Sequence, residues 1–86
     1  MNICFIIGKI ISEIKFDFII ENNTINKDIV TTRFKILLEN GSIIKVKAYG
    51  KIAEECFQKY VKSDIVSIYG MLNSNGELEI QEIDLL

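Results

Sequence analysis

Basic residues and a tyrosine alternate with apolar residues in the stretch from residue 42 to residue 49. Side chains alternate along a strand, so Lys45, Lys47 and Tyr49 point to one side. The opposite side is apolar and consists of Ile44, Val46 and Ala48. Cations along a groove neutralise phosphates, and an exposed aromatic ring stacks on an unpaired base. The chemistry that these residue types support is therefore the binding of a nucleic-acid strand. The alternatives are that the lysines form a solubilising surface and that Tyr49 packs on the barrel or on a loop.

A second strand with the same pattern precedes this stretch. In residues 29–38, Arg33 and Lys35 lie on the face opposite to Val30, Thr32, Phe34, Ile36 and Leu38. The dipeptide Asn40-Gly41 between the two alternating segments is a strong hairpin signal. The two strands are thus expected to be antiparallel neighbours, which sets Arg33 and Lys35 beside Lys45, Lys47 and Tyr49.

The other elements follow from periodicity. Apolar residues recur at helical spacing from Lys51 to Lys62, and alternation returns before Gly70 and again in residues 77–86. A bulge or the end of the strand is expected near Gln81. Residues 2–11 are predicted to form a strand that is apolar on both sides, with a bulge or tight coil at Gly8. The strand is expected to resume in residues 15–20, where the side chains again alternate between two sides. The polar segment 21–28 is expected to be a loop. This order predicts a small closed β-barrel with one helix.

Three segments together resemble the bacterial single-stranded DNA-binding protein family. They are Ala48-Tyr49-Gly50-Lys51-Ile52-Ala53-Glu54 with Tyr60-Val61-Lys62, the pattern Val66-x-Ile68-x-Gly70-x-Leu72, and the opening Ile3-Cys4-Phe5-Ile6-Ile7-Gly8-Lys9. The resemblance implies an all-β, five-stranded OB-fold barrel with its helix between strands three and four. It further implies that Tyr49 stacks on a base and that Lys51 and Lys9 match basic positions of the family. Roles in bacterial DNA replication, repair and recombination are implied in the same way.

The chain also departs from the family pattern. Ile43 stands where the family often has a second stacking aromatic, and the hairpins at Asn40 and Asn75 are short. We also expect the family's acidic tail to be absent. Stacking contributes about 1 to 3 kcal/mol per base, so we expect weak binding or binding by several subunits. Two alternatives stay open: an OB-fold protein-interaction or structural module with weak or no nucleic-acid binding, and an RNA-binding barrel.

The first strand predicts self-association. Ile3, Phe5 and Ile7 share one side of a strand whose other side faces the barrel interior. An exposed apolar strand face favours aggregation unless a partner covers it. We therefore expect these residues to form the interface of a homodimer or homotetramer.

Composition excludes several other classes of function. The chain has no His, and Cys4 and Cys56 fall on apolar segments, which argues against a zinc site and favours buried thiols. No nucleophile motif, phosphate-binding glycine loop or carboxylate pair at catalytic spacing is present, so we expect no enzyme activity, small-molecule substrate or cofactor.

The 86 residues are expected to form one domain, 1–86. The apolar segments are too short to span a bilayer, which predicts a cytoplasmic protein without membrane contact. The net charge of -2 argues against indiscriminate binding of polyanions.

Overall fold

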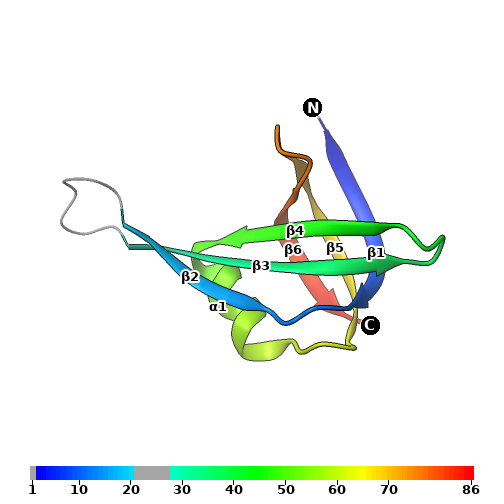
Figure 1. The fold of residues 1–86 in the computed structure, drawn as a ribbon, viewed down its shortest axis with the longest axis horizontal. Coiled ribbons are helices and arrows are strands. Elements are labelled where there is room, and N and C mark those ends of the chain that lie inside the picture. Colours follow the sequence, from blue (N-terminus) through cyan, green and yellow to red (C-terminus); the bar gives the residue numbers. More distant parts are fainter. Residues whose placement is uncertain (1, 21–27) are drawn as a thin grey trace.

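The computed structural model describes residues 2–20 and 28–86 (Figure 1). Within these residues the elements are β1 (Ile3–Ile10), β2 (Lys15–Ile20), β3 (Asp28–Leu38), β4 (Ile43–Tyr49), α1 (Gly50–Lys59), β5 (Ile65–Leu72) and β6 (Leu78–Leu85). The loop predicted at residues 21–28 lies outside the described residues except for Asp28, which begins β3.

The strands form one closed sheet. They are hydrogen-bonded in the order β1-β5-β6-β4-β3-β2, and a further pairing of β1 with β3 closes the barrel. All pairings are antiparallel except that of β4 with β6, which is parallel. Because β1 and β2 are two parts of the first strand, the architecture is the expected five-stranded OB fold, with its helix between the third and fourth strands.

Gly8 allows the barrel to close. It pairs with Leu38 of β3 and with Val66 of β5, so two strands flank it. A Cβ atom at this position would clash with the Ile36 side chain and lie 2.6 Å from the Leu37 carbonyl oxygen. Of the bulge and the tight coil expected as alternatives at Gly8, the bulge is wrong, because β1 keeps a regular register through Gly8 to Ile10. The glycine is required instead by the close approach of β3 to β1.

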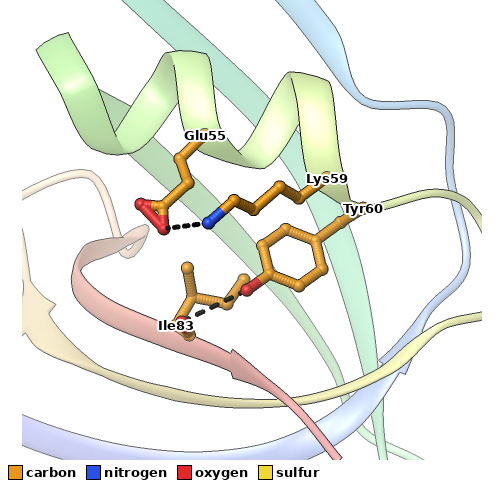
Figure 2. A network of polar contacts seen from close by, with 4 residues as sticks. All are labelled: Glu55, Lys59, Tyr60 and Ile83. Carbon is orange, nitrogen blue, oxygen red and sulfur yellow. Dashed lines mark hydrogen bonds and ion pairs between the residues drawn. The ribbon is translucent and has the colours of Figure 1, made fainter.

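The helix turns the chain from β4 to β5 and is shorter than predicted. Gly50 makes the turn out of β4. Its φ of 62° is a backbone conformation that favours glycine. The helix ends at Lys59 rather than at Lys62, because Tyr60 adopts an extended conformation and its hydroxyl donates to the Ile83 carbonyl oxygen at 3.3 Å (Figure 2). Figure 2 also shows the ion pair between Lys59 and Glu55, 3.3 Å long, on the last turn. The end of the helix is thus fastened to β6.

The apolar stripe of the helix is only partly buried. Ala53 and Cys56 are fully buried, whereas Phe57 and Val61 are exposed, contrary to the stripe expected from spacing. The Phe57 ring instead packs on Phe16 of β2, with 4.7 Å between the ring centroids. The buried hydroxyl of Thr32 in β3 donates to the Ala53 carbonyl oxygen at 2.9 Å, which holds the helix against the barrel.

The core occupies the interior of the barrel. The largest fully buried side chains in the described residues are Ile10, Ile36, Ile68, Leu78, Val46, Val66, Thr32 and Cys56. Of the bulge and the strand end expected as alternatives near Gln81, the structure has the bulge: Tyr69 pairs with Glu82 while Gly70 pairs with Ile80, which leaves Gln81 as the extra residue. The bulge changes the phase of β6 and buries both Ile80 and Ile83.

Both cysteines are free thiols, Cys56 buried and Cys4 partly buried, as predicted. Burial, assisted by the nearby Glu55 carboxylate, raises the pKa of the Cys56 thiol to about 12. It therefore stays protonated and unreactive at neutral pH. Across the described residues, no helix combines the length and the hydropathy that a transmembrane span requires.

Candidate nucleic-acid interface

The register of β3 and β4 places four cations side by side on the outer surface of the barrel. Arg33 is directly opposite Lys47, and Lys35 is directly opposite Lys45. Opposed residues of an antiparallel pair point to the same side of the sheet. The pairing predicted from the Asn40-Gly41 turn is therefore confirmed, and Figure 1 shows the two strands running side by side across the barrel.

Strand β2 extends this surface by one more cation. Lys15 is paired with Arg33, so a continuous row runs from Lys15 through Arg33 to Lys47 across three strands. We call the surface formed by Lys15, Arg33, Lys35, Lys45 and Lys47 the basic face. Sequence reasoning missed Lys15, although its alternation with Phe16 placed it on a strand, because no tight turn fixes the register of β2 against β3.

Tyr49 stands at one end of the basic face. Its side chain is 38% exposed, and the Lys47 Nζ atom lies over its ring, 4.9 Å from the centroid. A cation at this position holds the ring on the side of the basic face. Thr31, on the same side of β3 as Arg33, is buried and lies in register between Asp17 and Tyr49. The exposed part of the Tyr49 ring therefore lies next to the cations.

A groove of about 460 Å³ opens on the basic face. Its lining residues are Ser12, Glu13, Lys15, Arg33, Phe34, Lys35, Lys45, Val46 and Glu77. The segment between β1 and β2 forms one wall, which is held in place by two hydrogen bonds: the Lys35 backbone N–H donates to the Ser12 Oγ atom at 2.8 Å, and the Ser12 hydroxyl donates to the Glu13 carbonyl oxygen at 3.2 Å. The groove is thus a built feature of the barrel, and it was not foreseen from sequence.

The two remaining predicted cations lie beyond the two ends of the basic face. Lys9 of β1 pairs with Leu37, so it shares the outer side of β3 but lies toward the end opposite to Tyr49. The seven residues of β4 span about 20 Å, so the distance between Lys9 and Tyr49 is of about this size. Lys51 is exposed in the first turn of α1, beyond Tyr49. Together the cations cover the whole length of the β3–β4 pair.

The arrangement of like charges on the basic face opposes folding. Two like charges directly opposite each other on neighbouring strands are destabilising, by about 0.2 to 1 kcal/mol for each pair. Among the described residues, none of the five cations has an ion-pair partner within 4.0 Å. The ion pair found in this part of the chain joins Lys59 and Glu55 of α1. Two carboxylates, Glu13 and Glu77, also line the groove, so the positive charge is concentrated on β3 and β4. This concentration of cations makes the surface a candidate for an anionic ligand.

A second surface on the other side of the barrel is apolar. Ile3, Phe5 and Ile7 of β1 are 47%, 64% and 49% exposed. They are in register with Met71, Tyr69 and Ser67 of β5, which are partly buried. The structure thus brings the three predicted interface residues together on one sheet face, which we call the apolar face.

Solved structures with this fold exist, although sequence comparison finds no relative: no protein-family model matches the chain, and no curated protein matches its sequence. The SSB domain of a Synechococcus sp. protein matches with a TM-score of 0.81 at 17% identity, over 96% of this chain and 93% of that one. The single-stranded DNA binding protein from Thermus aquaticus matches with a TM-score of 0.83 at 16% identity, over 100% of this chain and 40% of its own. A mitochondrial single-stranded DNA binding protein from S. cerevisiae gives 0.77 at 19% identity, over 99% and 93%. At these identities the comparison establishes the OB fold of such domains.

Proposed function

We propose that this chain, which has the fold of single-stranded DNA-binding domains, binds single-stranded DNA on its basic face. The observation that carries the proposal is the set of directly opposed cations, Arg33 with Lys47 and Lys35 with Lys45, without ion-pair partners among the described residues. The two opposed pairs of like charge are unfavourable in the free protein, whereas a row of phosphates neutralises all four charges at once.

Binding combines two kinds of contact. The cations hold the phosphate backbone along β3 and β4, and the Tyr49 ring stacks on one base at the end of this path. Lys9 and Lys51 extend the path beyond either end of the basic face. Neither phosphate contacts nor stacking distinguishes one base from another, so the mechanism gives little sequence preference.

The small number of stacking side chains limits the affinity of one subunit. Ile43, in the place of a second aromatic, is 58% exposed on the same side of β4 as Tyr49 and offers no aromatic ring. We propose that the apolar face joins two or four copies of the chain into a homodimer or homotetramer. Several basic faces then act on one DNA strand, which raises the overall affinity without any new contact type.

Fluorescence anisotropy of a labelled oligo-dT, titrated with the protein at about 50 mM salt, tests this proposal. We expect saturable binding that Tyr49→Ala weakens by about fivefold or more, since a stacked base contributes about 1 to 3 kcal/mol. Tyr49→Phe is the matched control, because it keeps the ring and should keep the affinity.

The other outcomes are equally informative. No binding of oligo-dT at tens of micromolar protein would refute the proposal and leave the protein-interaction module as the explanation of the fold. Binding of oligo-rU but not of oligo-dT would assign the basic face to RNA. Equal losses of affinity in Tyr49→Ala and Tyr49→Phe would contradict stacking as the role of the ring.

A further inference from the structure

Two carboxylates lie at the border of the basic face, Glu77 just before β6 and Glu79 on it. Glu79 is in register with Lys47 in the parallel pairing of β4 and β6, and Glu77 lines the same groove as Arg33 and Lys45. Glu77 and Glu79 are both partly buried, and neither forms an ion pair within 4.0 Å with a described residue. The outer surface of the sheet therefore changes from positive on β4 to negative on β6.

The Asn73 side chain holds these two carboxylates in place. Its Nδ2 atom donates to Glu77 Oε1 at 3.3 Å and to Glu79 Oε2 at 3.1 Å. Its Oδ1 atom accepts from the backbone N–H groups of Asn75 and Glu77, at 2.9 and 3.0 Å. All four hydrogen-bonding positions of the amide are thus used. These hydrogen bonds hold the two carboxylates toward Asn73, beside the cations but outside ion-pair distance of them.

We propose that Glu77 and Glu79 are specificity-determining residues that exclude double-stranded DNA from the basic face. This inference rests on the proposed function and adds the basis of its selectivity. Neighbouring strands are about 4.8 Å apart, so the cations of β2, β3 and β4 cover a band about 10 Å wide. One row of phosphates fits this band.

A duplex carries two rows of phosphates, separated by a groove about 6 or 12 Å wide, and about one charge per 1.7 Å of its length. When one row lies on β3 and β4, the second row lies over β6 or beyond β2, which is the last strand in the order of the sheet. Over β6 it meets the two carboxylates, and beyond β2 it meets no further strand. A flexible single strand avoids both positions, so the repulsion acts mainly on the duplex.

The test compares two double variants that each remove two negative charges from the segment of residues 77–84. Glu77→Gln/Glu79→Gln neutralises the border while keeping oxygen acceptors for Asn73. Glu82→Gln/Asp84→Asn is the control, because both carboxylates are exposed on β6 at positions paired with β5. Dissociation constants are measured by anisotropy for labelled oligo-dT, and by competition with it for a duplex of equal length, at about 50 mM salt.

We expect the border variant to gain about fivefold more affinity for the duplex than for the single strand. The control should leave the ratio of the two dissociation constants unchanged. An unchanged ratio in the border variant, or an equal change in the control, would overturn the role of Glu77 and Glu79 while leaving the proposed function intact. A wild-type protein that binds neither nucleic acid would remove the proposed function and this inference together.

Discussion

Replacing Lys45 with Gln is expected to weaken DNA binding and to stabilise the fold at the same time. Lys45 lies opposite Lys35, and within the described residues no carboxylate forms an ion pair with either side chain. Removing one positive charge relieves the repulsion between the pair. The same change removes one contact to a phosphate. The two effects have opposite signs only if the cations are arranged for a ligand.

Both magnitudes follow from this geometry. Relief of one opposed pair stabilises the fold by about 0.5 kcal/mol, within the range for cross-strand pairs. For a domain of this size that raises Tm by about 2 to 4 °C. Loss of one phosphate contact makes the slope of log affinity against log salt less negative by about 0.7. If the variant and the wild type have equal affinities at 1 M salt, this change in slope makes the affinity of the variant about eightfold lower at about 50 mM salt.

Thermal unfolding and anisotropy titrations at several salt concentrations measure the two quantities. Lys62→Gln is the matched control, because Lys62 is an exposed cation in the turn after α1 and belongs to no strand. It should leave both the salt slope and the affinity close to those of the wild type. A Lys45→Gln variant with a lower Tm, or with an unchanged salt slope, would refute the interpretation of the basic face.

Three further predictions concern the rest of the barrel. Phe5→Glu should convert the expected dimer or tetramer into a monomer by light scattering at micromolar concentration; a monomeric wild type would contradict the interface. Gly70→Ala should prevent stable folding, measured by urea unfolding, because the added Cβ would clash with the Glu79 carbonyl oxygen; wild-type stability would contradict the close approach of β5 and β6. Because the folded-state pKa of Cys56 is raised from 9.0 to about 12, unfolding releases a proton in this window. Stability should therefore fall as pH rises from 9 toward 12, less steeply in Cys56→Ala, and equal pH profiles would contradict this assignment.

The sequence predicts what local patterns determine. The turn at Asn40-Gly41 fixes the register of β3 against β4, so the opposed pairs of the basic face follow from alternation alone. The bulge at Gln81 follows in the same way, from the change of phase between Ile80 and Ile83.

Pairings between distant segments cannot be predicted in this way. Lys15 joins the basic face because β2 pairs with β3, and Glu79 borders it because β6 pairs with β4. Neither pair of strands is connected by a tight turn that would fix its register. The end of the helix is equally non-local, since the Tyr60 hydroxyl is bonded to the Ile83 carbonyl oxygen, far along the chain. Helical spacing continues through Tyr60 in the sequence, whereas this contact and the extended backbone of Tyr60 end the helix.

The most direct test of DNA binding on the basic face is a titration of the isotope-labelled protein with oligo-dT, followed by amide NMR shifts. We expect the largest shifts at Arg33, Lys35, Lys45 and Lys47, with a shift of the Tyr49 ring signals toward those of a stacked ring. Shifts confined to the apolar face around Phe5, or no shifts at all, would contradict the proposed interface.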